Sequence, residues 1–230
     1  MKPIILITAQ FELESSREWI ASEYVKAVQS VGGVPVVLPV SFCYNNIGTV
    51  LKKCDGILFT GGPDFEAEHY NMKAPGVKTR VSPERDAVEF PLMRMALDAD
   101  KAVLGICRGA QLMCIASGGK LCQDIAECMK NKEEHDTDPP FDRCAHNIII
   151  EESPLLRLTG KRVIGVNSRH HQAISECGSG MEIMASSPGG VVEAVYMKNN
   201  RFAWGVQWHP ELMRDDVSEM LFGEFIKNAK

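Results

Sequence analysis

The chain has 230 residues, of which 45% are hydrophobic and 24% charged, an ordinary composition for a globular protein. Its net charge of -5 gives no sign of a basic surface that would bind nucleic acid or an anionic membrane, so we expect a small-molecule ligand. No apolar stretch approaches the roughly 20 residues of a membrane span, and the N-terminus lacks a signal-peptide cleavage pattern. We therefore expect one cytoplasmic domain over residues 1–230, with no nucleic-acid or membrane partner.

In the first half of the chain, short runs rich in Val and Ile alternate with amphipathic stretches of helical length. This alternation is typical of a largely parallel sheet covered by helices. The predicted strands are residues 3–8, 34–39, 56–60 and 102–106. The predicted helices are residues 16–32 and 47–53, one beginning at Pro83, and residues 108–117.

The second half is richer in short strands separated by Gly, Ser, Pro and Asn. Strands are predicted at residues 146–150, 163–166, 181–185, 191–197 and 202–208, and a helix at 216–227. The polar residues within 125–145 show no hydrophobic period, which leaves a solvated loop and a lid over the site as alternatives. We predict a single-domain, three-layer α/β sandwich of the flavodoxin-like class. It has a mostly parallel central sheet, flanking helices and a small β-rich C-terminal part.

The cysteines are dispersed through a chain too long to need a disulfide scaffold, so we expect reduced thiols. No cysteine pair has the spacing of a zinc site, and the residues that come nearest to one are His135, Cys144 and His146. We expect neither a metal nor another cofactor.

Residues 105–109, Gly-Ile-Cys-Arg-Gly, follow the predicted strand 102–106 and have the form of a nucleophile elbow. The two glycines allow a strand and a helix to pass close together, with Cys107 at the bend. The positive end of the following helix favours the thiolate over the thiol. Cys107 is therefore the candidate nucleophile.

A base for this cysteine is expected at the end of another strand. His209 follows the predicted strand 202–208, and Glu211 can hold its imidazole in one tautomer. The turn Gly61-Gly62 follows a third strand and can supply a backbone N–H that joins that of Arg108 in an oxyanion hole. The sequence thus predicts a triad of Cys107, His209 and Glu211.

These segments together resemble the class I glutamine amidotransferase superfamily, whose triad is Cys, His and Glu. Three further features resemble the gamma-glutamyl-gamma-aminobutyrate hydrolases, also called peptidase family C26. The features are Arg85-Asp86 with Glu89, Cys107-Arg108-Gly109, and residues 166–172, Val-Asn-Ser-Arg-His-His-Gln. The resemblance implies hydrolysis of a gamma-glutamyl amide through a glutamyl thioester. The residues that it assigns to the glutamyl head group are Gln111, Asn167, Ser168, Arg169 and His170.

Three functions stay open. The first is a free-standing hydrolase of small gamma-glutamyl amines, such as gamma-glutamyl-gamma-aminobutyrate or a polyamine derivative, because no synthetase motif is seen. The second is a glutaminase subunit that supplies ammonia to a separate synthase. The third is a binding protein that keeps the fold without the chemistry. Phe65 and His69 depart from the family pattern after the glycine turn, which leaves the leaving amine undefined, and a homodimer is possible.

Overall fold

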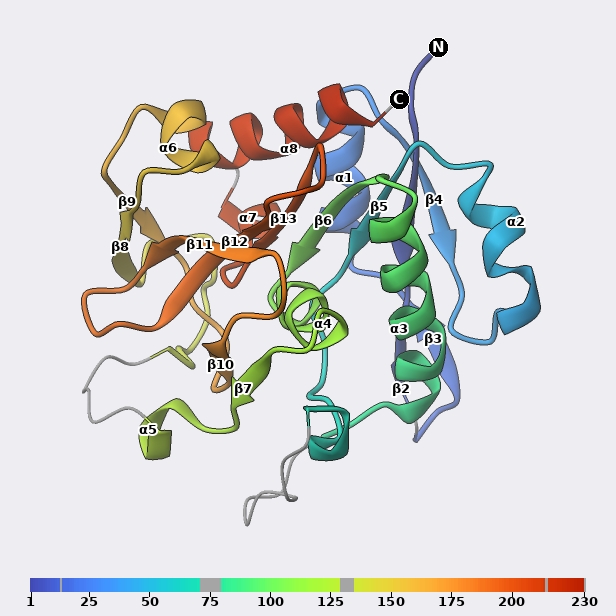
Figure 1. Cartoon of the computed structure of the whole chain (residues 1–230), viewed down its shortest axis with the longest axis horizontal. Coiled ribbons are helices and arrows are strands. Elements are labelled where there is room, and N and C mark those ends of the chain that lie inside the picture. Colours follow the sequence, from blue (N-terminus) through green and yellow to red (C-terminus); the bar gives the residue numbers. More distant parts are fainter. Residues whose placement is uncertain (13, 71–79, 129–134, 214, 230) are drawn as a thin grey trace.

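A nine-stranded sheet runs through the part of the molecule that the computed structural model describes, residues 1–12, 14–70, 80–128, 135–213 and 215–229. Figure 1 shows this sheet with helices on both of its faces. In sheet order its strands are β4 (Val34–Leu38), β1 (Ile4–Thr8), β5 (Gly56–Phe59), β6 (Ala102–Ile106), β13 (Ala203–Val206), β12 (Val192–Met197), β11 (Met181–Ser186), β8 (His146–Ile150) and β9 (Val163–Val166).

The sheet is parallel at one end and antiparallel at the other. The five strands from β4 to β13 pair in parallel, whereas each pairing from β13 to β9 is antiparallel. The predicted α/β class with a parallel core is confirmed, and the β-rich C-terminal part continues the same sheet. The carboxyl ends of β5, β6 and β13 are neighbours, so the turns that follow these strands meet at one edge, where parallel α/β sheets place their sites.

Two apolar cores explain the three layers. Successive side chains of a strand point to opposite faces, so in β1 Ile5 and Ile7 enter one core and Leu6 enters the other. The first core includes α1 (Ser22–Ser30) and α8 (Asp216–Asn228). The second includes α2 (Ile47–Leu51), α3 (Pro83–Asp98) and α4 (Arg108–Ala116). The smaller helices are α5 (Ile125–Cys128), α6 (Pro154–Thr159) and α7 (Pro210–Met213).

The helix expected over residues 16–32 begins later than predicted. Its first residues instead form β3 (Arg17–Trp19), which pairs with β2 (Gln10–Glu12) in a hairpin. Glu18 holds this hairpin in place because its carboxylate accepts hydrogen bonds from the backbone N–H groups of Val40 and Ser41. These contacts bridge 22 and 23 residues, and a local helical period does not show them.

The expectation that every cysteine is reduced is wrong for one pair, because Cys122 and Cys128 form a disulfide. The bridge joins β7 (Lys120–Cys122) to the end of α5, and β7 pairs with β10 (Ala173–Glu176) in a small separate sheet. The spacing of Cys122 and Cys128 in the sequence does not show that the fold brings the two sulfur atoms together. The other six cysteines, Cys107 among them, are free thiols.

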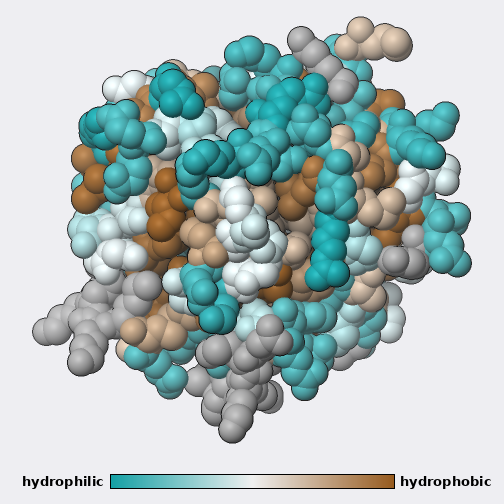
Figure 2. Space-filling view, in the orientation of Figure 1, coloured by the Kyte–Doolittle hydropathy of each residue, from teal (hydrophilic) through white to brown (hydrophobic). Residues whose placement is uncertain are grey.

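Hydrophilic side chains are spread over the face of the molecule in Figure 2 and divide its apolar areas into separate patches. None of the helices in the described ranges is long and apolar enough to cross a membrane. Of the polar segment discussed as a loop or a lid, residues 129–134 lie outside those ranges.

Candidate active site

Cys107 lies at the sharp bend between β6 and α4. Its backbone has φ 52° and ψ -104°, a left-handed conformation rare for a residue with a side chain. Gly105 and Gly109 make the bend possible. A Cβ on Gly105 would lie 2.5 Å from the Gly109 backbone, and one on Gly109 would lie 2.3 Å from the Phe59 carbonyl oxygen. The bend directs Cys107 to the carboxyl edge of the sheet, at the N-terminus of α4.

His209 follows β13 and is paired with Glu211. The His209 Nδ1 atom lies 2.7 Å from Glu211 Oε1, and both side chains are buried. Burial alone would lower the pKa of His209, but the charges of Glu211 and Cys107 and hydrogen bonds with both raise it to about 10. The imidazolium is therefore the stable form beside the Cys107 sulfur at neutral pH.

The turn after β5 lies against both of these groups. A Cβ on Gly61 would lie 2.8 Å from His209 Cε1 and 3.6 Å from Cys107 Cβ. Only a glycine fits this position without displacing the imidazole. Cys107, His209 and the glycine turn, which are far apart in the sequence, therefore form one cluster.

Two backbone N–H groups near Cys107 are available for an oxyanion. The Gly61 N–H donates a 3.0 Å hydrogen bond to the Tyr24 hydroxyl. By contrast, the N–H groups of Gly62 and Arg108 have no acceptor in the part of the chain that the structure describes. Of the three residues expected to form the oxyanion hole, Gly62 and Arg108 therefore have backbone N–H groups without an acceptor among the described residues. The Gly61 N–H instead connects the turn after β5 to Tyr24 on α1.

Tyr24 is a site residue that the sequence did not indicate. Burial raises its pKa well above the ordinary value, and the nearby Glu211 carboxylate adds to this effect. The neutral phenol therefore lies between Gly61 and Glu211. It links the turn after β5 to Glu211, the carboxylate that bonds to the His209 imidazole.

Arg85 fixes the same turn from α3. Its guanidinium donates to the Thr60 and Gly61 carbonyl oxygens, each at 2.8 Å, and to Glu89 Oε1 at 2.9 Å. The Arg85 side chain is 1% exposed, so these acceptors replace the water that it loses on folding. Arg85 and Glu89, which the sequence analysis noted, therefore support the turn after β5 from α3.

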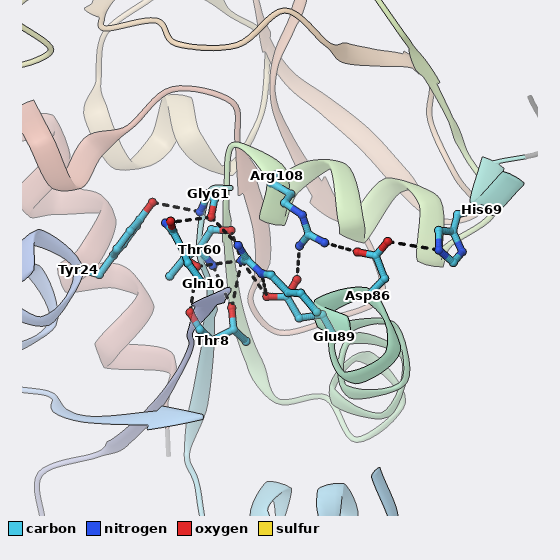
Figure 3. A network of polar contacts seen from close by, with 10 residues as sticks. Thr8, Gln10, Tyr24, Thr60, Gly61, His69, Asp86, Glu89 and Arg108 are labelled. Carbon is cyan, nitrogen blue, oxygen red and sulfur yellow. Dashed lines mark hydrogen bonds and ion pairs between the residues drawn. The ribbon is translucent and has the colours of Figure 1, made fainter. Parts of the chain in front are cut away.

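The Arg108 side chain joins this network and not the reaction centre. Its guanidinium pairs with the Glu89 and Asp86 carboxylates and lies 4.0 Å from the centroid of the Phe65 ring. His69 Nε2 lies 3.3 Å from the other oxygen of Asp86 (Figure 3). Phe65 and His69, the two departures from the family pattern, thus both contact the residues behind the elbow.

The expected head-group residues have different surroundings. Gln111 is buried, and its Nε2 donates to the Gln172 carbonyl and to Gln207 Oε1, each at 3.2 Å. Asn167 holds the backbone of His209: its Nδ2 donates to the His209 carbonyl, and its Oδ1 accepts from the His209 N–H at 2.8 Å. This second contact gives Asn167 a positioning role that the sequence did not indicate.

The next three residues lie along one short segment. The Ser168 hydroxyl donates to the His135 carbonyl at 2.6 Å, and the exposed Arg169 lies over the Phe141 ring. His170 is buried, and its Nδ1 lies 3.0 Å from the Gln172 carbonyl oxygen. The same carbonyl accepts from Gln111, so His170 and Gln111 are linked through one acceptor.

The fold and this cluster define an α/β protein of the class I glutamine amidotransferase-like kind. A profile of the peptidase C26 family matches residues 3–211, and the chain belongs to that family. Gamma-glutamyl-gamma-aminobutyrate hydrolase PuuD of Escherichia coli (strain K12) is 32% identical over 217 residues, which cover 90% of this chain and 85% of that protein. The "Putative glutamine amidotransferase Rv2859c" of Mycobacterium tuberculosis is 31% identical over 230 residues, 94% of this chain and 72% of that protein.

A solved structure shows the same fold. The crystal structure of "a putative gmp synthase subunit a protein" from Thermoplasma acidophilum superposes with a TM-score of 0.68 at 17% identity, over 100% of this chain and 94% of the other. The relatives carry both hydrolase and amidotransferase names, so the comparisons establish the family and leave the substrate to the residues of the site.

Proposed function

We propose that the protein is a cysteine hydrolase that cleaves the gamma-glutamyl amide bond of a small gamma-glutamyl amine. The observation that carries this proposal is the convergence of Cys107, His209 and Glu211, with the N–H groups of Gly62 and Arg108 beside the nucleophile. The name of the Escherichia coli relative supports the gamma-glutamyl substrate class. Cys107, His209 and Glu211 are the proposed triad.

In the proposed reaction, the Cys107 thiolate attacks the γ-carbonyl carbon and a C–S bond forms. The carbonyl oxygen becomes an oxyanion that accepts hydrogen bonds from the N–H groups of Gly62 and Arg108. The His209 imidazolium gives its proton to the amide nitrogen as the C–N bond breaks, and the amine leaves. The raised pKa of His209 is consistent with this acid role.

In the second half of the reaction, neutral His209 takes a proton from water, and the hydroxide adds to the thioester. Collapse of the intermediate breaks the C–S bond, releases glutamate and restores the thiolate, while His209 again carries the proton. Glu211 stays ionised and orients the imidazole throughout. Besides the substrate, these steps consume one water molecule, and they then balance.

For the glutamyl head group, we propose Gln111 together with residues 167–170. Gln111 uses its amide nitrogen on Gln172 and Gln207, so its Oε1 is the atom assigned to accept from the α-ammonium. Asn167 and Ser168 contribute mainly by fixing the backbone of the segment, because their side chains already bond to His209 and His135. Arg169 is the exposed cation of the set and suits the α-carboxylate.

The test is glutamate release from a panel of gamma-glutamyl amides, followed by mass spectrometry. The panel includes gamma-glutamyl-gamma-aminobutyrate, gamma-glutamyl-putrescine and free glutamine. Cys107→Ala is expected to abolish turnover. Cys114→Ala is the matched control: this thiol lies on the same helix, and burial with the nearby Cys177 raises its pKa to about 12, so activity should persist.

Preference for one substituted amide, lost only in Cys107→Ala, supports the hydrolase. If the protein turns over only free glutamine, the glutaminase-subunit hypothesis would replace the hydrolase hypothesis. Equal inertness of all three proteins across the panel would contradict both enzymes and favour the binding protein.

A further inference from the structure

Three imidazoles surround one buried carboxylate in the antiparallel half of the molecule. Glu193 lies on β12, and its Oε1 is 3.3 Å from His135 Nδ1, 3.4 Å from His146 Nε2 and 3.6 Å from His170 Nε2. The Glu193 side chain is fully buried, and the most exposed of the three rings, His146, is 12% exposed. None of the four side chains belongs to the proposed triad.

The hydrogen bonds on the outer side of two rings fix their tautomers. His170 Nδ1 lies 3.0 Å from the Gln172 carbonyl, and His146 Nδ1 lies 3.2 Å from the Asn147 carbonyl. A carbonyl only accepts, so the ring proton is on Nδ1 in both cases. Each neutral ring therefore presents the lone pair of its Nε2 to Glu193.

This arrangement places the Nε2 lone pairs of His146 and His170 next to the Glu193 carboxylate. The Nε2 atoms of His146 and His170 and both Glu193 oxygens are buried, and no hydrogen-bond partner is found for them among the described residues. Such a set is stable when a cation sits between the ligand atoms.

The separations favour a metal ion over shared protons. Charge-assisted N–H···O bonds measure about 2.7–2.9 Å, shorter than the 3.3–3.6 Å seen here. Zinc bonds of about 2.0–2.1 Å in a tetrahedron place neighbouring ligand atoms about 3.3 Å apart. The ligand atoms of His135, His170 and Glu193 all lie within 4.8 Å of one another.

We propose that Glu193, His135 and His170 bind a divalent transition-metal ion of the zinc type, with His146 beside Glu193. Imidazole nitrogens with one carboxylate are ligands that zinc accepts, and the bond of His170 Nδ1 to the Gln172 carbonyl is an outer contact of the kind that orients metal-binding histidines. An open pocket of about 450 Å³ is lined in part by His146, next to this cluster.

The sequence indicated only part of this site. It named His135, Cys144 and His146 as the residues nearest to a zinc site and led us to expect no metal, and the Cys144 thiol lies 3.3 Å from the His146 carbonyl oxygen. Glu193 and His170 come from other segments. The cluster forms because β8 and β12 belong to the antiparallel half of one sheet, with the turn after β9 beside them.

The ion's role is structural support of the neighbouring site. The Gln172 carbonyl accepts from both His170 Nδ1 and Gln111 Nε2, so the orientation of His170 affects the proposed head-group residue. The Glu193 carbonyl accepts the Gln207 N–H at 2.7 Å, two residues before His209. Metal removal is therefore expected to lower the melting temperature and raise KM more than it lowers kcat.

The first experiment measures metal in the Cys107→Ala protein, which removes the nucleophile as a competing ligand. We expect elemental analysis to find one zinc-type ion per chain, or one tightly bound Zn²⁺ after chelation and reloading. Co²⁺ in its place should give the strong visible absorption of a tetrahedral site. A protein that takes up neither ion at micromolar concentration would overturn the proposal.

The second experiment locates the ion. Glu193→Gln and His170→Gln in the same background should each weaken Zn²⁺ binding at least 100-fold. His69→Gln is the matched control, because Glu66, His69 and Asp86 form the other group of carboxylates and an imidazole in the described chain. Loss of binding in His69→Gln, or undiminished binding in Glu193→Gln and His170→Gln, would refute the site. If Glu193→Gln fails to fold by circular dichroism, His170→Gln decides.

Discussion

Replacing Glu211 by glutamine keeps the side-chain volume and removes the charge that orients His209. The bond it alters is 2.7 Å long between two buried groups. A hydrogen bond to a charged group contributes about 1.5–3 kcal/mol, and about 1.4 kcal/mol corresponds to a tenfold change in rate. We therefore expect kcat/KM to fall about 10- to 160-fold in Glu211→Gln.

The same variant should change the pH dependence in a defined direction. The charges of Glu211 and Cys107 raise the pKa of His209 to about 10 against the burial of the ring, so loss of the Glu211 charge lowers that pKa. The basic limb of the kcat/KM profile then moves to lower pH. A raised pKa stabilises the fold below the unfolded value of about 6.5, and this contribution is lost as the pH rises toward 10.

Two measurements check these expectations. One is kcat/KM from pH 5 to 10 on the best substituted amide, and the other is urea unfolding at low and high pH. The difference in unfolding free energy between wild type and Glu211→Gln should be largest near neutral pH and below, and should shrink toward pH 10. Glu182→Gln is the control, because this exposed carboxylate bonds to Tyr196 and Lys198 at the surface. An unmoved basic limb with kcat/KM within twofold of wild type would refute the reasoning.

Three further variants test the groups behind the site. Arg85→Met leaves Glu89 buried with one partner fewer, and should lower the unfolding free energy by about 3–5 kcal/mol in urea titrations, whereas a loss below 1 kcal/mol would contradict the network. Tyr24→Phe removes the acceptor of the Gly61 N–H, so it should cost about 1 kcal/mol and lower kcat with little change in KM. Leu104→Ala in β6, where the side chain is fully buried, should cost about 2–5 kcal/mol without moving the pH profile.

Much of the parallel half of the fold could be predicted because its signals are local. The strand before Cys107 is a buried apolar run, and the glycines at 105 and 109 are needed where strand and helix backbones touch. Residues 17–19, the second strand of the hairpin, were wrongly predicted as the start of a helix because the hairpin depends on Glu18 contacts with residues far along the chain. Local periodicity cannot report such contacts.

Only those site residues that belong to sequence motifs could be predicted. Asn167 could be singled out by resemblance, but its bonds to the His209 backbone follow from the way the turn after β9 lies against the end of β13. Tyr24 carries no sequence signal at all, because α1 brings it to Gly61 from the other side of the sheet. Polar residues that support a site from another layer become visible only in three dimensions.

The network behind the elbow bears on how Cys107 is activated. Arg108 follows the nucleophile directly, and a free guanidinium there would be a strong reason for a thiolate. Its charge is instead neutralised by Glu89 and Asp86, and Arg85 completes a buried set of two cations and two anions. In the proposed reaction, the positive field at Cys107 therefore comes from the N-terminus of α4 and from the His209 imidazolium, which also supplies the proton for the leaving amine. In that proposal Arg108 acts through its backbone N–H, while its side chain belongs to the ion-pair network behind the elbow.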